Sequence, residues 1–557
     1  MAALPIVTLE QDDRLDSWKE IAAFLNRGVR TVQRWEHMEG LPVHRHQHAK
    51  LGSIYALKSE VSAWWDSRGA QLEPKTAGER IVRKSSGEKR RLLVLPFVNL
   101  SGDAGQEYLS DGLTEEMITR LACLQPDRLS VIARSTAMAY KGGAKRADQI
   151  AAELDLDYIL EGSVRAAGHR IRVTAQLIGT REDAHLWAQN YDRDLSDVLD
   201  VQADVAAAIA REVRLALPPP ERTAAGAGRA MDPEAYKAFL MGRYLMNQMN
   251  ASGLAQSIPW FERAIEKAPD HAPAHAGIAQ AYGLLATVPF DALAPHEAMP
   301  KAAAAARKAL ELDVSLPEAH GALGLVLHHY EWNWAEAEKA YQRALELNPD
   351  YTAVLLRYAW LLLALGRTDD ALALVARAQG IAQEIDPHLI VVVRATRAAA
   401  FYFAREFDRS IAECRAALEL DPSDFLLHFL LGRALVRKGR VREGAAVFTA
   451  VKAAWDDVPL LAAGAGLALA LAGQKVAATR VLRRLKEQRK HRNVPATYLG
   501  ILCGGLRDYE GALDWMERAL EERADGLTLL NAEPMLDGFR KDLRFQALVR
   551  RVGLVPK

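Results

Sequence analysis

The amino-acid sequence predicts a multidomain chain of three folded parts: a small helical head, an α/β domain and an all-α solenoid. Three observations predict this organisation. The chain has 557 residues, which is too long for a single hydrophobic core. Its apolar pattern changes near residue 91 from helical to alternating strand and helix, and becomes wholly helical near residue 233. Within the helical part, prolines recur at a regular spacing.

The composition restricts the class of protein. Lys and Arg number 71 and Asp and Glu also number 71, so any affinity for nucleic acid must come from a local patch. The three cysteines, Cys123, Cys414 and Cys503, form no CxxC pair, which disfavours a disulfide framework or a cysteine zinc site. The first residues lack the features of a signal peptide, and the longest apolar run, 460–473, is shorter than the roughly 20 residues of a membrane span. We therefore expect a cytoplasmic protein without membrane contact.

The head, residues 1–70, contains two predicted helices separated by a break at NRG. Ser17 is a candidate cap for the first helix. The second helix covers residues 30–38, and Val32 and Trp35 point inward from it because they are three positions apart. The stretch IYALKSEVSAWW then predicts a strand and a third helix.

These residues resemble the winged helix-turn-helix of the MerR and phage excisionase group. The resemblance rests on the triplets Arg30-Thr31-Val32, Arg34-Trp35-Glu36 and Gly40-Leu41-Pro42, with Arg45. It implies that the second helix enters the major groove of double-stranded DNA, where arginine can bind guanine edges and glutamine adenine edges. The candidate DNA-binding residues are Arg30, Thr31, Gln33, Arg34, His44, Arg45, His46 and Lys50. The long dimerisation helix of MerR proteins is absent, so homodimer formation is left open.

The wing region is rich in histidine. His44, His46 and His48 would point to one side of a strand, a spacing that can chelate a metal. No carboxylate or cysteine stands close in the sequence to complete such a site, so we expect no metal. Contact with DNA phosphates and a plain solvated surface remain the alternatives. Residues 14–69 carry nine Lys and Arg against six Asp and Glu, a local excess that suits DNA binding.

A polar, basic stretch at residues 71–90 predicts a linker, and an α/β domain follows at 91–217. Apolar runs and alternation predict strands at 91–100, 129–133 and 183–194, a hairpin at 157–180, and helices at 108–124 and 198–217. The stretches LLVLPFVNLSGDAGQEYLSDGLTEEMITRL and DYILEGSVRAAGHRIRVTAQLI resemble the TolB amino-terminal-like domain. That resemblance implies an α/β domain used for contacts with other proteins.

The α/β domain offers little for catalysis. Asp111, Glu115 and Glu116 are predicted to begin a helix, where carboxylates favour the helix dipole. Ser135 and Thr136 have no histidine near them in the sequence, and the chain has no phosphate-binding loop or HExxH motif. Relatives of this domain sometimes carry cyclase or kinase modules, and this chain carries neither. We therefore expect no enzymatic activity, no catalytic residues and no cofactor.

Residues 218–232 are rich in proline and glycine and predict a second linker, and residues 233–524 predict about eight helical repeats. The prolines at 317, 349, 387, 422, 459 and 495 are spaced by 32, 38, 35, 37 and 36 residues. The repeats resemble the tetratricopeptide repeat in the positions of their small and large residues. Those positions include Leu323, Gly324, Ala337, Tyr341, Ala344 and Pro349, and later Leu499, Gly500, Ala512, Met516 and Ala519. Residues 525–557 are predicted to cap the last helix pair.

The first helices of such repeats line the concave face of the solenoid, and the resemblance implies a protein or peptide partner there. By register, the candidate partner-binding residues are Trp360, Tyr402, Phe429, Arg433 and Arg437. The alternative is that these side chains pack between helices or beneath the C-terminal turns. Cys414 and Cys503 fall at core positions of the repeat and are predicted to be buried fillers.

Together these features predict a cytoplasmic DNA-binding transcriptional regulator whose solenoid and α/β domain receive a protein or peptide partner. The alternative is a protein–protein interaction scaffold whose head does not bind DNA.

Overall fold

The computed structural model describes parts of the head and most of the remaining chain. In the head these parts are residues 13–15, 17–25, 32, 35–36, 41–45 and 54–64. Beyond the head they are residues 89–556 without 123–127, 144, 168, 181–183, 195–196, 213–231, 289, 386–388 and 456–457. The chain divides into two compact units, Met1–Glu88 and Lys89–Lys557. In these described ranges no helix is long and apolar enough to cross a membrane.

The first unit has a small antiparallel sheet packed with helices. Its strands are β1 (Arg14–Leu15), β2 (His44–Arg45) and β3 (Ile54–Leu57), in the order β1-β3-β2. Helix α1 (Trp18–Phe24) precedes β2, and residues 58–64 are helical after β3. Ser17 caps α1, as predicted, because its hydroxyl accepts a hydrogen bond of 3.2 Å from the backbone nitrogen of Glu20.

The core of this unit confirms the predicted inward side chains. Val32 is 0% exposed and Trp35 is 2% exposed, and both are helical. The ring of Trp35 lies 5.9 Å from that of Trp64. The other buried apolar residues are Leu15, Ile21, Ala22, Leu25, Leu41, Ala56 and Val61.

The second unit begins with a mixed sheet. Its strands are β4 (Arg90–Val94), β5 (Val98–Asn99), β6 (Leu129–Val131), β7 (Tyr158–Ala167), β8 (Arg170–Gly179) and β9 (Ala184–Asp194). The order is β6-β4-β7-β8-β9, and β5 pairs with β7. Strand β4 is parallel to β6 and β7, while β7, β8 and β9 are antiparallel. Each strand lies where the sequence predicts one.

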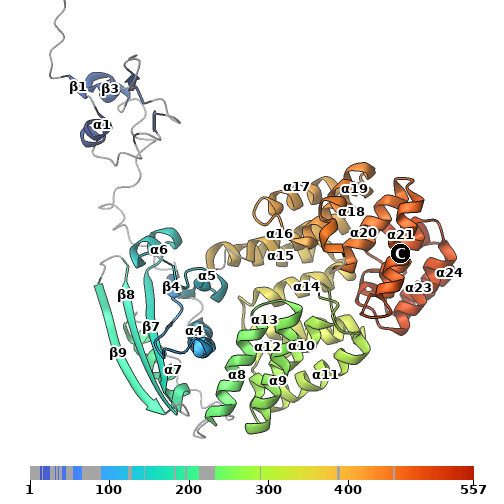
Figure 1. Ribbon diagram of the computed structural model, residues 1–557, viewed down its shortest axis with the longest axis horizontal. Helices are drawn as coiled ribbons and strands as arrows, with labels where there is room; N and C mark the ends of the chain where they lie inside the picture. The colour runs from blue at the N-terminus through green and yellow to red at the C-terminus, as the bar shows by residue number, and fades with distance from the viewer. Residues whose placement is uncertain are drawn as a thin grey trace, which may run out of the picture. The chain divides into compact units, whose positions relative to one another are not determined.

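Helices cover one face of this sheet. Helices α4 (Glu107–Ala122) and α7 (Val198–Glu212) pack on it (Figure 1). The sequence predicted both long helices and missed two short ones, α5 (Arg134–Met138) and α6 (Ala147–Leu154). These short helices have too few turns to show a periodic apolar pattern.

The remainder of the second unit is a helical solenoid. Eight helix pairs follow one another in its described residues, the number that the sequence predicts. The pairs are α8 (Pro233–Met246) with α9 (Ala251–Lys267), α10 (Ala272–Leu285) with α11 (Pro295–Leu312), α12 (Pro317–Val326) with α13 (Trp334–Leu347), α14 (Thr352–Ala364) with α15 (Thr368–Ile385), α16 (Ile390–Phe403) with α17 (Phe407–Leu418), α18 (Phe425–Arg437) with α19 (Val441–Ala450), α20 (Pro459–Leu471) with α21 (Lys475–Gln488), and α22 (Ala496–Gly505) with α23 (Tyr509–Glu521). The other elements are the π-helix η3 (Leu327–Glu331), the 3-10 helices η5 (Lys452–Trp455), η6 (Asp525–Leu529) and η7 (Pro534–Phe539), and helix α24 (Leu543–Arg551).

Small residues allow the paired helices to approach closely. A Cβ atom at Gly324 would lie 2.7 Å from the ring of Tyr341, which belongs to the second helix of the same repeat. Tyr341, Ala337 and Ala344 are all 0% exposed. The tetratricopeptide positions predicted from the sequence therefore have the packing role that the resemblance implies.

The α/β domain and the first repeats share one hydrophobic core, which runs from β4 through α8 to α12. Arg243 of α8 donates a hydrogen bond of 3.0 Å to Glu116 of α4 and also pairs with Glu115. The prediction that these carboxylates begin a helix is wrong. They lie in the middle of α4, which begins at Glu107, and they join the α/β domain to the solenoid. Asp111, which is 5% exposed, pairs instead with Lys141.

Candidate functional site

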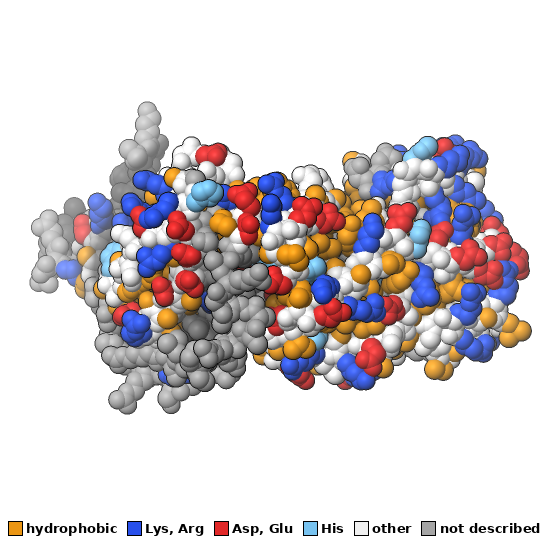
Figure 2. Space-filling model, turned by 90° about the horizontal axis from the view of Figure 1, so that it is seen from below, with side chains coloured by type: hydrophobic (Ala, Val, Ile, Leu, Met, Phe, Trp, Pro, Cys, Tyr) orange, Lys and Arg blue, Asp and Glu red, His pale blue; other side chains and the backbone are white. Residues whose placement is uncertain are grey.

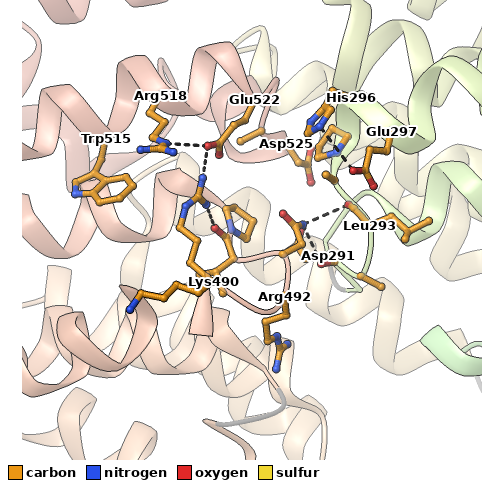
Figure 3. A pocket seen from close by; sticks show the side chains of 18 of the residues that line it. Asp291, Leu293, His296, Glu297, Lys490, Arg492, Trp515, Arg518, Glu522 and Asp525 are labelled. Atoms are coloured by element: carbon orange, nitrogen blue, oxygen red, sulfur yellow. Dashed lines mark hydrogen bonds and ion pairs between the residues drawn. The ribbon is translucent and has the colours of Figure 1, made fainter. Parts of the chain in front are cut away.

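The last repeats return to the second repeat and close the solenoid into a ring. Asn493 donates hydrogen bonds to the backbone oxygens of Asp291 and Leu293 at 2.9 and 3.3 Å. The hydroxyl of Tyr498 donates to the carboxyl group of Asp291. Figure 3 shows this seam, with Asp291, Leu293, His296 and Glu297 on one side and Trp515, Arg518 and Glu522 on the other. Burial raises the pKa of the Asp291 carboxyl group to about 7.

Asp525 gives a second link across the seam. Its carboxylate pairs with His329 and accepts a hydrogen bond of 3.1 Å from the backbone nitrogen of Val288. Burial raises the pKa of Asp525, but the charge interaction and hydrogen bond with His329 lower it by more. The pKa of Asp525 therefore lies below its ordinary value. Figure 2 shows that charged side chains cover the end of the solenoid that carries α21, α23 and α24.

Residues 525–539, which we call the C-terminal segment, lie against the inner face of the ring. Glu533 accepts a hydrogen bond of 2.7 Å from the hydroxyl of Tyr402 and pairs with Arg433. Asp537 pairs with Arg405 at 2.7 Å and with Arg437 at 3.4 Å. Two carboxylates of the segment are thus held by cations from α18 and from the turn after α16, and by the Tyr402 hydroxyl of α16.

The five predicted partner-binding residues gather on this inner face. The guanidinium of Arg433 lies 4.6 Å from the ring centre of Tyr402 and 4.7 Å from that of Phe429. Trp360 and Phe429 line a cavity beside the segment. Tyr402 is 0% exposed and Arg433 is 8% exposed, because the C-terminal segment covers them. For these two residues the structure agrees with the alternative of packing beneath the C-terminal turns.

The sequence did not reveal the groups that complete this site. Arg405, Glu533 and Asp537 were not among the candidates, because the segment was interpreted only as a cap. Their charges were a usable signal, since EPMLDGF places two carboxylates beside apolar residues that must pack against another part of the protein.

Two of the candidate DNA-binding residues belong to the described part of the head. The Nε2 atom of His44 lies 2.6 Å from Glu60, and its ring stacks on Tyr55 at 5.0 Å. Arg45 donates a hydrogen bond of 2.6 Å to Glu36, which raises the pKa of Arg45, and its side chain is 54% exposed. Glu60, 16 positions along the chain, therefore lies beside His44, a contact that the sequence did not reveal. The other candidates, Arg30, Thr31, Gln33, Arg34, His46 and Lys50, lie outside the described residues.

The two cysteines in the described part of the chain are buried. Cys414 is 0% exposed and Cys503 is 1% exposed, which confirms that both are buried fillers. Burial raises the pKa of Cys414 to about 12 and that of Cys503 to about 11, so both thiols are neutral at physiological pH. Cys123 lies outside the described residues.

Comparisons with known families identify two kinds of domain. Residues 331–389 and 396–459 match tetratricopeptide repeat models. Residues 88–208 match the second domain of HilA/YgeH-like transcriptional regulators. The solenoid therefore consists of tetratricopeptide repeats, and the α/β domain is of a kind found in transcriptional regulators. These three matches do not show the TolB resemblance or the winged head.

A curated relative also matches. The chain is 36% identical over 243 residues to the protein named "Putative adenylate cyclase 3" of Rhizobium meliloti (strain 1021), a match that covers 43% of this chain. It spans only 40% of the length of that relative.

Two solved structures resemble parts of the chain. A thermophilic tetratricopeptide protein of Thermus thermophilus, TTC0263, is 17% identical with a TM-score of 0.31, and it covers 36% of this chain and 99% of its own. Human IFIT1, solved as a dimer with PPP-AAAA, is 20% identical with a TM-score of 0.36, and it covers 58% of this chain and 79% of its own.

Proposed function

We propose that the chain is a DNA-binding transcriptional regulator of the cytoplasm. The observation that carries the proposal is the match of residues 88–208 to a domain of transcriptional regulators, directly after a head whose sequence resembles a winged helix-turn-helix. The proposed DNA contacts are made by Arg30, Thr31, Gln33 and Arg34 on the second helix, and by His44, Arg45, His46 and Lys50 on the wing. Helix residues select bases and wing residues hold phosphates.

The solenoid is proposed to receive a protein or peptide partner on its inner face. Tetratricopeptide repeats bind proteins as a class, and here Tyr402, Arg433 and Arg437 already hold the C-terminal segment of the same chain. Trp360 and Phe429 line the cavity beside that segment. Because Glu533 and Asp537 fill the cationic positions, a partner peptide that replaces them should carry carboxylates at a similar spacing.

The second candidate function is a scaffold whose head does not bind DNA. One observation favours it: both described wing candidates are already paired with carboxylates, His44 with Glu60 and Arg45 with Glu36. A phosphate would have to compete with these carboxylates for the two side chains. In this alternative the α/β domain and the solenoid perform the whole function by binding proteins.

An enzymatic role is not part of the proposal. The name of the curated relative describes a putative adenylate cyclase, but the match covers less than half of that protein. Incubation of the full-length chain with ATP and a divalent cation, followed by detection of cyclic AMP, tests this directly. Formation of cyclic AMP at a rate above that of a heat-denatured sample would overturn the non-enzymatic assignment.

Selection of genomic fragments by the full-length chain tests the regulator against the scaffold. The regulator should retain a small set of duplexes, and the affinity for a retained duplex should fall steeply as salt is raised. An Arg30→Ala/Arg34→Ala variant should lose the selection, whereas Arg343→Ala, on the solenoid, should keep it. Recovery of random fragments by all three proteins would support the scaffold.

A further inference from the structure

A cavity lies inside the ring of repeats, beside the ion pairs that hold the C-terminal segment. Its volume is about 580 Å³. Small-molecule sites usually have volumes of roughly 300–1,000 Å³ and mostly apolar walls. The first helices of successive repeats, from α10 to α22, form one wall, and the C-terminal segment forms the other. Leu284, Leu325, Leu356, Trp360, Phe403 and Phe429 contribute much of the apolar surface.

Most polar groups in the cavity wall are already engaged by the protein. His329 pairs with Asp525, and Arg433 pairs with Glu533. The hydroxyl of Thr396 donates a hydrogen bond of 3.0 Å to the carbonyl of Val392, one turn earlier in α16. These groups need no ligand to satisfy them.

Two polar groups in the described wall of the cavity are not engaged in this way. Arg357 of α14 lines the cavity, and its guanidinium forms no hydrogen bond or ion pair with any residue that the structure describes. The hydroxyl of Thr497 of α22 is buried without a hydrogen-bond partner in the same described part of the chain, and Thr497 is 3% exposed. A buried hydroxyl and a cation in apolar surroundings are both costly unless a polar atom satisfies them. The cavity thus combines an apolar interior with one unmatched cation and one unmatched hydroxyl.

We propose that this cavity binds a small amphipathic anion, an organic acid whose carboxylate pairs with Arg357 and whose apolar chain fills the interior. A carboxylate matches the planar fork of a guanidinium, and the pair strengthens where water is excluded. The apolar chain is favoured because the rest of the wall is mostly apolar and its polar groups are already paired within the protein. This site is separate from the proposed DNA contacts; it shares Trp360, Phe429 and Arg433 with the proposed partner contacts, whereas Arg357 and Thr497 are not among them.

The structure favours a small molecule over a peptide here. The C-terminal segment pairs with Arg405, Arg433 and Arg437, so a bounded cavity with Arg357 in its wall remains beside it. A cationic ligand is disfavoured because each carboxylate in the wall is engaged. Asp525 and Glu533 are paired, and Asp424 accepts a hydrogen bond of 2.8 Å from the backbone nitrogen of Leu427.

Calorimetric titration of the full-length chain with two amphiphiles tests the proposal. Dodecanoate and dodecyltrimethylammonium share one apolar chain and differ in the sign of the head, and both are used below micelle-forming concentrations. We expect dodecanoate to bind one to one and the ammonium compound to bind at least about tenfold more weakly, since charge-assisted hydrogen bonds contribute roughly 10–100-fold in affinity. Arg357→Met should remove this preference, and Arg357→Glu should reverse it.

Two further variants locate the binding. Arg343→Met removes an exposed arginine of α13 that pairs with Glu346, and should leave both affinities unchanged. Ala353 is exposed and lines the cavity, so Ala353→Trp should fill space without displacing the core and should abolish binding of dodecanoate. Circular dichroism of each variant confirms that it is folded.

Three results would overturn the proposal: no binding of dodecanoate, equal affinity for the two amphiphiles, or a preference that survives Arg357→Met. Binding of a synthetic peptide of residues 525–539 in place of dodecanoate would identify the inner face as a peptide site and would also overturn it. None of these titrations involves DNA, so a negative result would not bear on the proposed role as a DNA-binding regulator.

Discussion

Tyr402 and Glu533 are separated by 131 residues, yet the hydroxyl of Tyr402 donates a hydrogen bond of 2.7 Å to the carboxylate of Glu533. The same carboxylate pairs with Arg433, and both members of this pair are less than 10% exposed. A buried ion pair tolerates the loss of one partner poorly, because the other charge is then left without a counterion. The inner-face residues therefore hold the last turns of the chain inside the solenoid.

The first prediction concerns this pair. Glu533→Ala leaves Arg433 buried without its carboxylate and should destabilise the full-length chain by about 3–5 kcal/mol, the usual cost of breaking a buried pair. Glu533→Gln should cost less, since its amide oxygen can still accept the hydrogen bond from Tyr402. Denaturant unfolding measures both, and limited proteolysis should show faster cleavage within residues 525–539 of the alanine variant.

Glu510→Ala is the matched control, because the side chain of Glu510 is 84% exposed and pairs only at the surface. If Glu533→Ala and Glu510→Ala have equal small effects, the C-terminal segment is not held by its ion pairs.

Local sequence patterns were sufficient for the elements of the fold. Alternation over residues 157–180 predicted the β7–β8 hairpin, and the spacing of small and large residues predicted the packing of Gly324 against Tyr341. They could not predict which distant side chains meet. Arg243 and Glu116 are 127 residues apart, and no periodic signal links them. Glu115 and Glu116 were therefore assigned to the start of a helix that begins at Glu107 and holds them in its middle.

The candidate site was predicted only in part, again because local sequence patterns do not show which distant residues meet. Helical register placed Trp360, Tyr402 and Arg433 on one inner face, where the structure has them. Register says nothing of what covers that face, so the C-terminal segment was missed. Arg357 was also missed, although YTAVLLRYAWLLLALG gives a signal: a single arginine within an apolar helix needs either a partner or a function.

The second prediction concerns the contact between the α/β domain and the solenoid. Arg243→Met removes the cation that pairs with Glu115 and Glu116, and burial already raises the pKa of Glu116. We expect residues 89–557 to unfold in one cooperative transition in the unaltered chain and in two transitions, one for each domain, in this variant. Differential scanning calorimetry of the full-length chain measures this. The control Arg263→Met removes a cation that is 52% exposed and should leave the transition unchanged. A single transition in both variants would show that apolar packing alone couples the domains.

The third prediction concerns pH and the ring seam. Because the pKa of Asp291 is about 7 in the folded chain and near 4 in an unfolded one, the folded state binds the extra proton between these values. This contribution to stability is complete below about pH 4 and is lost as the pH rises through about 7. Asp291→Asn keeps a neutral side chain at every pH and should remove this part of the dependence. Unfolding midpoints at pH 5, 6 and 8 measure the difference.

Asp155→Asn is a matched control for the seam. Asp291 and Asp155 have positive φ angles of 45° and 50°, a conformation that asparagine also adopts readily. Asp155 is exposed, so its replacement should leave the pH profile unchanged. Asp525, whose folded pKa is lowered, makes the stability fall as the pH decreases, which is the opposite direction. This effect occurs only at acidic pH, below the measured range of pH 5 to 8. Identical profiles for Asp291→Asn and the unaltered chain would refute the role of Asp291.

The last prediction concerns the wing of the head. Arg45 donates to Glu36 and remains half exposed, so a DNA phosphate and Glu36 would compete for its guanidinium. Glu36→Gln should therefore strengthen DNA binding, since it weakens the competitor and removes a negative charge beside the duplex. Arg45→Ala should weaken preferred and scrambled duplexes alike and lower the salt slope by about one. Arg34→Ala, by contrast, should weaken binding to the preferred duplex by about 1–3 kcal/mol and binding to scrambled DNA only slightly.

Competition binding at two salt concentrations measures the effects of all three substitutions, and the double variant Glu36→Gln/Arg45→Ala is the decisive control. If Glu36→Gln strengthens binding as much without Arg45 as with it, Arg45 makes no phosphate contact, because the gain then comes from removal of the carboxylate alone.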